Sequence, residues 1–101
     1  MRPEEIALRM RGVTGLQTVV ASRIVRQLSQ MGCEPRRVLH ELGLNERQQT
    51  QFNQVDPGYL AATLRWLEEP AHLMLNYGAA GYPERLAQID DAPLFLLIEG
   101  D

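Results

Sequence analysis

The fold of this chain is decided by residues 16–31, which read Leu16-Gln17-Thr18-Val19-Val20-Ala21-Ser22-Arg23-Ile24-Val25-Arg26-Gln27-Leu28-Ser29-Gln30-Met31. Apolar residues recur in this stretch at spacings of three and four, the period of one face of an α-helix. They are Leu16, Val19, Val20, Ile24, Leu28 and Met31. The opposite face is polar and partly basic, with Arg23, Arg26, Gln27 and Gln30. The pattern therefore predicts an amphipathic helix that stops at Gly32 and buries its apolar face.

Shorter helical patterns around this stretch predict a small helical bundle over residues 1–70. Pro3 and two glutamates favour a helix start over residues 3–10. Further helices are expected at residues 34–42, 46–53 and 57–69, and Asn45 and Asp56 are suitable N-caps for the last two. The residues expected to face inward are Val38, Leu39, Leu42, Tyr59, Leu60, Thr63, Leu64 and Leu67.

The remaining segment, residues 71–101, has strand and turn patterns. Two short strands are expected at 72–77 and 94–98, with a short helix at 83–89 between them that buries Leu86 and Ile89. The second strand is entirely apolar, which is typical of a strand buried on both faces. Two strands and one short helix cannot cover such a strand, so we interpret this segment as the start of an α/β domain that continues outside the chain. The alternative is an apolar tail packed against the helices.

Composition excludes several classes of protein. Hydrophobic residues make up 45% of the chain and charged residues 23%, which is typical of a packed domain and too apolar for a disordered tail. The longest apolar run, Leu94–Ile98, is far below the roughly 18 residues of a membrane span, and no secretory signal follows Met1, so we expect a cytoplasmic location and no membrane partner. Cys33 has no partner for an internal disulfide and no basic neighbour to activate it, so we expect it to be inert. His40 and His72 are too far apart for a zinc site with one cysteine, and no metal or cofactor is expected.

Charge is unevenly distributed along the chain. Residues 1–55 carry eight arginines and five acidic residues, a net charge of +3, whereas residues 56–101 carry two arginines and eight acidic residues, a net charge of −6. All ten cationic residues are arginines, whose planar guanidinium suits phosphate, although a GC-rich genome would have the same effect. The overall charge of −3 argues against strong non-specific nucleic-acid binding by the whole chain, while the basic first half leaves a local contact open.

The segment Gly12-Val13-Thr14-Gly15 is similar to the glycine-containing turn of a helix-hairpin-helix element. In such a turn, exposed backbone amides at a helix start bind a phosphate. Arg11 and Arg23 would then be the phosphate partners of Gly12 and Gly15. The alternative is a plain turn between two helices.

Other residues are further candidates for contact with nucleic acid. Arg36 and Arg37 are the only adjacent basic pair, and the alternative for them is a solvated helix face. Tyr59 and Trp66 could stack on bases, but at helical spacing with leucines they are also typical core or interface residues. No nucleophile or acid–base constellation is present in the sequence, so we do not expect an enzyme.

The order of several short motifs resembles the DNA-processing protein A family, also called DprA or Smf. In the second part of the chain they are Tyr77-Gly78-x-x-Gly81-Tyr82-Pro83-x-x-Leu86, Ile89-Asp90-Asp91-x-Pro93, Leu94-Phe95 and Glu99-Gly100-Asp101. In the first part they are Gly43-Leu44-x-x-Arg47-Gln48 and Trp66-Leu67-Glu68. The resemblance implies a mainly α fold: a sterile-alpha-motif-like (SAM-like) or helix-hairpin-helix bundle over residues 1–70, then an incomplete Rossmann-like α/β segment over residues 71–101 with two short strands.

The resemblance also implies a function. Members of the family bind single-stranded DNA in natural transformation and recombination and help to load RecA, without an established catalytic activity or metal. Their main DNA-binding residues lie downstream of the part that this chain resembles, so none can be assigned here. The alternative function is a protein–protein adaptor, which docks a regulator or forms a homodimer without touching DNA.

Overall fold

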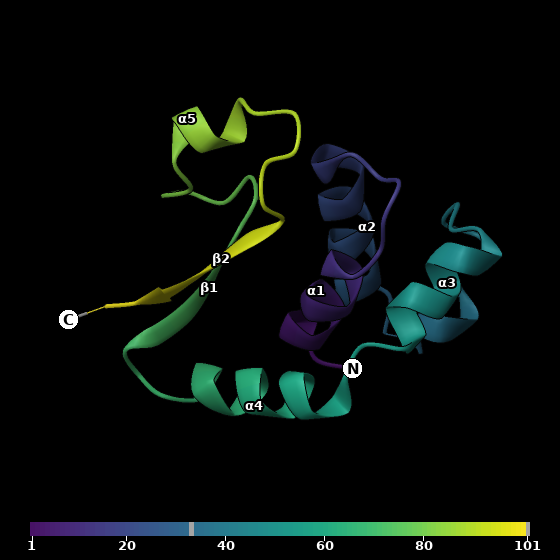
Figure 1. Ribbon diagram of the computed structural model, residues 1–101, viewed down its shortest axis with the longest axis horizontal. Helices are drawn as coiled ribbons and strands as arrows, with labels where there is room; N and C mark the ends of the chain where they lie inside the picture. Colours follow the sequence, from purple (N-terminus) through teal and green to yellow (C-terminus); the bar gives the residue numbers. More distant parts are fainter. Residues whose placement is uncertain (33, 101) are drawn as a thin grey trace.

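The computed structural model describes residues 1–32 and 34–100. Figure 1 shows helices packed together on one side of the molecule and a pair of strands on the other, with a short helix beyond the strands. The elements are α1 (Pro3–Arg11), α2 (Thr18–Gln30), the 3-10 turn η1 (Pro35–Arg37), α3 (Glu46–Asn53), α4 (Pro57–Leu67), β1 (His72–Asn76), α5 (Glu84–Ala87) and β2 (Phe95–Glu99). The expected fold class, mainly α with two short strands, is confirmed. Cys33 and Asp101, the subjects of two expectations above, lie outside the described residues.

Helix α1 is the centre of the bundle, because it contacts α2, α3 and α4. Its apolar residues are almost completely removed from water, with Ile6 and Met10 at 1% exposure and Leu8 at 2%. They pack into two adjoining clusters. The buried members are Ile6, Met10, Val13, Ala21, Ile24, Leu28, Leu39, Leu44 and Phe52 in one, and Ala7, Leu8, Leu60 and Phe95 in the other.

Helix α2 follows the predicted pattern with two exceptions. Ile24 and Leu28 are buried against α1 as expected, and Arg23 points outward. Val19 and Met31, however, are 47% and 41% exposed. Val19 lies in the first turn and Met31 is the C-cap residue, so the two exceptions lie at opposite ends of the helix.

The prediction of a helix at residues 34–42 is wrong. The chain forms the single 3-10 turn η1 and then continues in turns to Gly43, which has a left-handed φ of +99°. Leu39 is nevertheless fully buried, and Val38 and Leu42 pack against the same cluster. The apolar positions were thus identified correctly, but the segment after η1 forms consecutive turns in place of a regular helix.

Helices α3 and α4 begin where their caps predicted. The Asn45 side chain accepts a hydrogen bond from the Gln48 backbone amide at 2.8 Å, and the Gln48 side chain accepts one from the Asn45 amide at 3.0 Å, which completes a capping box. At the start of α4, the Asp56 carboxylate accepts from the Tyr59 amide at 2.8 Å. The interior of α4 differs from the expectation at Tyr59, which is 42% exposed.

Strands β1 and β2 form a two-stranded antiparallel sheet in which Leu75 pairs with Leu96 and Asn76 with Phe95. Phe95 is buried against α1 and α4 residues, with 4% exposure. The expectation that β2 is buried on both faces is wrong for the described residues, since Leu97 is 39% exposed. The strand pair therefore packs on the helical bundle through one end and one face.

The segment between the strands is a turn-rich loop that contains α5 (Figure 1). Tyr82 connects the two ends of this loop. Its hydroxyl donates a hydrogen bond to the Pro93 carbonyl at 2.7 Å, and its ring packs edge-on against the ring of Tyr77. Burial, and secondarily the nearby Tyr77, raise the pKa of Tyr82. Ile89 was expected to face inward but is 51% exposed, because α5 ends at Ala87 before it reaches that residue.

None of the helices in the described part of the chain is both long enough and apolar enough to cross a membrane.

Candidate nucleic-acid interface

The glycine-containing turn between α1 and α2 is held by two glutamines of α3. Gln51 accepts from the Thr14 amide at 2.9 Å and donates to the Thr14 hydroxyl at 2.9 Å. Gln48 donates to the Thr14 carbonyl at 3.0 Å. Gly15 has a φ of +83°, which glycine adopts without strain, and a Cβ there would lie 3.3 Å from Gln48 Nε2. The turn is therefore a rigid, specified feature of the fold.

Three amides of this turn already have acceptors inside the protein. Gly12 donates to the Arg9 carbonyl at 3.1 Å, Val13 donates to the Met10 carbonyl at 3.0 Å, and Thr14 donates to Gln51. A phosphate at this turn would have to meet amides from Gly15 onward. That Gly12 and Gly15 form a phosphate site remains a prediction. The three hydrogen bonds leave the amides of Gly12, Val13 and Thr14 unavailable to such a phosphate.

A hollow of about 700 Å³ lies beside Gly15, between the turn and residues 90–94. Two carboxylates, Asp90 and Asp91, line it. Negative charges oppose a phosphate, so this side of the turn is electrostatically unfavourable for a nucleic-acid backbone.

Arg11 lies between this hollow and a second one. Its guanidinium carbon is 5.3 Å from the centre of the Phe95 ring, a cation–π arrangement. It forms no ion pair or hydrogen bond with residues 1–32 or 34–100. Arg11 is exposed, so its N–H donors remain available to an external anion.

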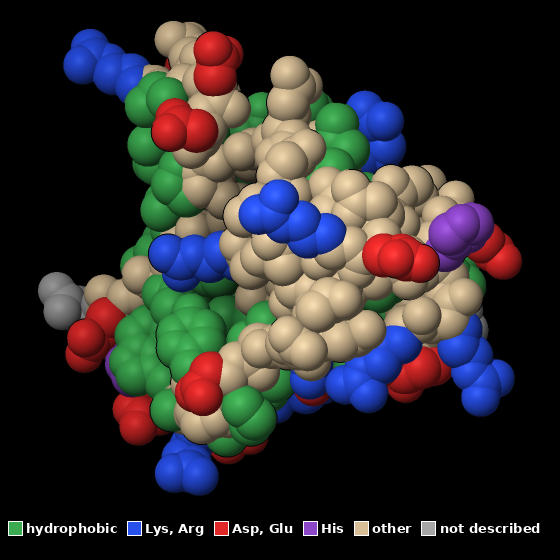
Figure 2. Space-filling model, turned by 45° about the vertical axis from the view of Figure 1, so that its right-hand side comes forward, with side chains coloured by type: hydrophobic (Ala, Val, Ile, Leu, Met, Phe, Trp, Pro, Cys, Tyr) green, Lys and Arg blue, Asp and Glu red, His purple; other side chains and the backbone are tan. Residues whose placement is uncertain are grey.

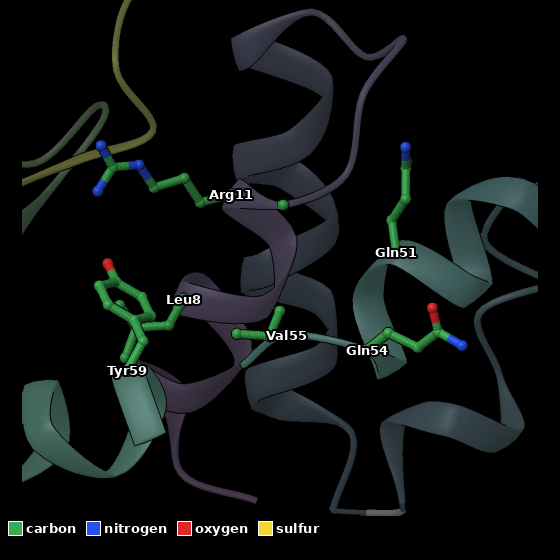
Figure 3. A pocket seen from close by; sticks show the side chains of 7 residues that line it. Leu8, Arg11, Gln51, Gln54, Val55 and Tyr59 are labelled. Carbon is green, nitrogen blue, oxygen red and sulfur yellow. The ribbon is translucent and has the colours of Figure 1, made fainter. Parts of the chain in front are cut away.

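The second hollow is an open groove of about 690 Å³ between α1, the end of α3 and the start of α4. Its lining residues are Leu8, Arg11, Gly12, Gln51, Gln54, Val55 and Tyr59. Figure 3 shows Arg11 and Tyr59 on one wall, and Gln51 of α3 and Gln54 at its C-cap on the opposite side. We call this the α1–α3–α4 groove. No acidic residue lines it, in contrast to the hollow beside Asp90.

The structure brings together only some of the predicted residues. Arg11 and Gly12 share the α1–α3–α4 groove, and Arg11 and Gly15 share the acidic hollow. Arg23, Arg36 and Arg37 are exposed but line neither. Figure 2 shows basic side chains spread over the visible face with acidic ones between them, so no single basic patch forms there.

The two candidate aromatic residues have different environments. Trp66 is half-buried and stacks on His72, with ring centres 3.8 Å apart and an angle of 8° between the planes. The His72 Nδ1 is also 2.7 Å from the Trp66 carbonyl oxygen. Trp66 therefore joins the end of α4 to β1. Tyr59 is exposed and lines the groove, whereas Trp66 lines neither of the two hollows.

Sequence reasoning missed the role of Arg9 and of the α3 glutamines. Arg9 is 8% exposed, pairs with Glu5 at 3.0 Å and donates to the Phe52 carbonyl at 3.2 Å. The i,i+4 spacing of Glu5 and Arg9 was a signal for the pair, but the contact with Phe52 joins residues 43 positions apart. For Gln48 the capping-box spacing from Asn45 was the available signal.

No group of three or more His, Cys, Asp or Glu side chains gathers as metal ligands would in residues 1–32 and 34–100. The α1–α3–α4 groove contains arginine, glutamine and tyrosine as its functional groups, whereas the hollow beside Gly15 contains Arg11, Asp90 and Asp91. The groups of the groove bind anions and polar rings and do not supply a cation site.

The fold is a small helical bundle to which a strand pair is attached. The chain belongs to the SMF/DprA family, since residues 1–65 match the family described as the SMF/DprA SAM domain. It is also similar to Protein Smf of Escherichia coli (strain K12), with 29% identity over 97 residues. The alignment covers 96% of this chain and 26% of that protein, so the chain spans about a quarter of the length of this relative. No solved structure matches.

Proposed function

We propose that this chain is the N-terminal helical module of a cytoplasmic, non-enzymatic DNA-processing protein that acts in natural transformation and recombination. In the full-length protein the activity would be the binding of single-stranded DNA and assistance in loading RecA. Membership of the SMF/DprA family supports a role in DNA processing. The finer assignment to single strands and RecA follows from the family resemblance.

We further propose that the helical module contacts the DNA directly through its basic half. The observation that carries this proposal is Arg11, an exposed cation with no acidic partner in the described part of the chain. It lies next to the Gly12–Gly15 turn and lines both the groove without carboxylates and the hollow that contains Asp90 and Asp91. An arginine in this situation gains an ion pair on binding phosphate and loses none.

The test is a titration of fluorescently labelled single-stranded DNA with the chain at about 50 and 200 mM salt. We expect micromolar, salt-sensitive binding by a monomer. The double variant Arg11→Ala/Arg23→Ala should bind more weakly, and the slope of log affinity against log salt should fall by about 1 to 2, because two phosphate contacts are lost. Unchanged affinity and slope in this variant would contradict direct contact through these residues.

A second candidate function is a protein–protein module, either an adaptor or a self-association domain. It is favoured by exposed apolar side chains on the strand pair, Leu73 at 47% and Leu97 at 39%. Figure 2 also shows hydrophobic side chains exposed together on part of the visible face. Size-exclusion chromatography run beside the titration separates the two: a dimer without DNA affinity favours the adaptor, and a monomer that binds DNA favours the first proposal.

A further inference from the structure

The α1–α3–α4 groove combines a flat aromatic wall with a free cation. Tyr59 is in the first turn of α4, where the Asp56 carboxylate holds its backbone amide at 2.8 Å. This cap fixes the helix start from which the side chain projects, and the residue is 42% exposed. Figure 3 shows its ring on the same wall as Arg11, with the phenol oxygen directed toward the guanidinium side.

The floor of the groove is apolar. Leu8 is 2% exposed and belongs to the core, while Val55 is half-buried. Gly12 adds no side chain to this floor: a Cβ there would lie 3.6 Å from Val55 Cγ2 and 3.7 Å from the Gln51 carbonyl oxygen. A larger residue at Gly12 would therefore enter the groove next to Val55.

The polar groups of the groove differ in whether they are already engaged. Gln51 has both amide atoms hydrogen-bonded to Thr14. Gln54, the C-cap residue of α3, has no side-chain hydrogen bond with residues 1–32 or 34–100, and neither has the Tyr59 hydroxyl. The groove thus offers a guanidinium, an amide and a phenol around an apolar floor.

We propose that the α1–α3–α4 groove seats one nucleotide of single-stranded DNA, with the base stacked on Tyr59 above Val55 and the adjoining phosphate on Arg11. This inference rests on the proposed function and assigns it to a specific site. A nucleotide carries a flat π face and an anion side by side, which matches the ring and the cation on this wall. The groove volume of about 690 Å³ is within the usual range of about 300–1,000 Å³ for small-molecule pockets.

The experiment uses fluorescence anisotropy to compare the binding of two DNA strands of equal length and charge. One is an oligothymidylate of about ten nucleotides, a length within the range of single-strand site sizes, and the other is the same strand without bases. Because stacking depends on the base and not on the phosphate, we expect the abasic strand to bind about tenfold more weakly. Tyr59→Leu should remove this difference between the strands, and Tyr59→Phe should keep it, because phenylalanine retains the aromatic face.

Two further variants test the cation and the floor. Arg11→Ala should weaken both strands equally and lower the single-strand salt slope by about 0.7, the value for one phosphate. Gly12→Leu should weaken the base-containing strand toward the abasic level by filling the groove. Arg85→Ala removes an exposed arginine that lines no part of the groove, and it should leave the tenfold difference between strands intact.

The outcomes separate this inference from the proposed function. If the chain binds both strands equally, or if Tyr59→Leu keeps the difference, the nucleotide site is wrong while direct DNA contact stands. If neither strand binds even at about 50 mM salt, direct DNA contact by this module is wrong, and the nucleotide site with it. Circular dichroism melting of each variant controls for loss of fold.

Discussion

At the scale of single residues, α1 contains two arginines with opposite roles. Arg9 and Arg11 are two positions apart, so on a helix they point about 200° from each other. Arg9 turns inward, pairs with Glu5 and donates to the Phe52 and Asn53 carbonyls at 3.2 Å each. These carbonyls are at the C-terminal end of α3, where helix carbonyls lack partners of their own. Arg11 turns outward and has no such acceptor.

Arg9→Ala should destabilise the fold by about 2 to 3 kcal/mol, because it leaves the α3 carbonyls and the partly buried Glu5 carboxylate without their donor. Urea unfolding followed by circular dichroism measures the change. Arg11→Ala is the matched control, since it deletes the same side chain from the same helix. Its cost should stay below about 1 kcal/mol, the value of an exposed cation–π contact. Equal costs for the two variants would contradict this assignment of roles.

At the scale of elements, the short helix α3 depends on its capping box. It has eight residues, below the roughly 12 to 15 at which an isolated helix becomes even marginally stable. The reciprocal bonds between Asn45 and Gln48 satisfy two amides at its start, and Gln48 also reaches the α1–α2 turn. The cap thus fixes both the helix and the turn beside Arg11.

Asn45→Ala should cost about 1 kcal/mol of stability, the usual effect of removing an N-cap side chain. The loss should be local, so amide hydrogen exchange should accelerate in α3 and at Thr14 before it does so in α2. Asn45→Asp, which keeps the capping oxygen, should restore most of the stability. Exchange that accelerates equally throughout the chain would contradict the local role of the cap.

At the scale of the whole molecule, the strand pair and the bundle share one core. Phe95 of β2 packs with Ala7, Leu8 and Leu60 of the helices, and Met74 of β1 lies against the same cluster. The Thr18 hydroxyl of α2 also donates to the Ala92 carbonyl. These contacts join residues 71–100 to the helices, whether or not residues 1–70 and 71–101 belong to separate domains, a division that stays a prediction.

Phe95→Ala should destabilise the chain by about 3 to 5 kcal/mol, because it removes a buried aromatic ring and leaves a cavity between the strands and α1. Thermal unfolding by calorimetry measures the loss, and hydrogen exchange should show that β1 and β2 lose protection. Leu97→Ala in the same strand is the control and should cost less than about 1 kcal/mol, since Leu97 is 39% exposed. A similar cost for both variants would argue against packing of the strands through Phe95.

The candidate site could be predicted from the sequence only in part. Arg11 and Gly12 were predicted as site residues because a glycine-containing turn after a basic helix end can be recognised from neighbouring residues alone. Both residues line the groove. Tyr59 was named as a base-stacking candidate, with burial as the alternative, and its exposure depends on how α4 lies against α1. Gln54 gave no signal at all, because its neighbours in the groove come from α1 and α4.

Local sequence patterns were sufficient to identify the starts of α1, α3 and α4, the two strands and several apolar positions of the core, but not the buried Ala7, Leu8 and Phe52. Caps, prolines and hydrophobic period act over a few residues, so they can be read without knowing the fold. Long-range packing sets the burial of Arg9 and the exposure of Arg11, the exposed Leu97 of β2, and the groove without carboxylates. Each of these depends on contacts between residues far apart in the chain, such as Arg9 with Phe52, which no local pattern encodes.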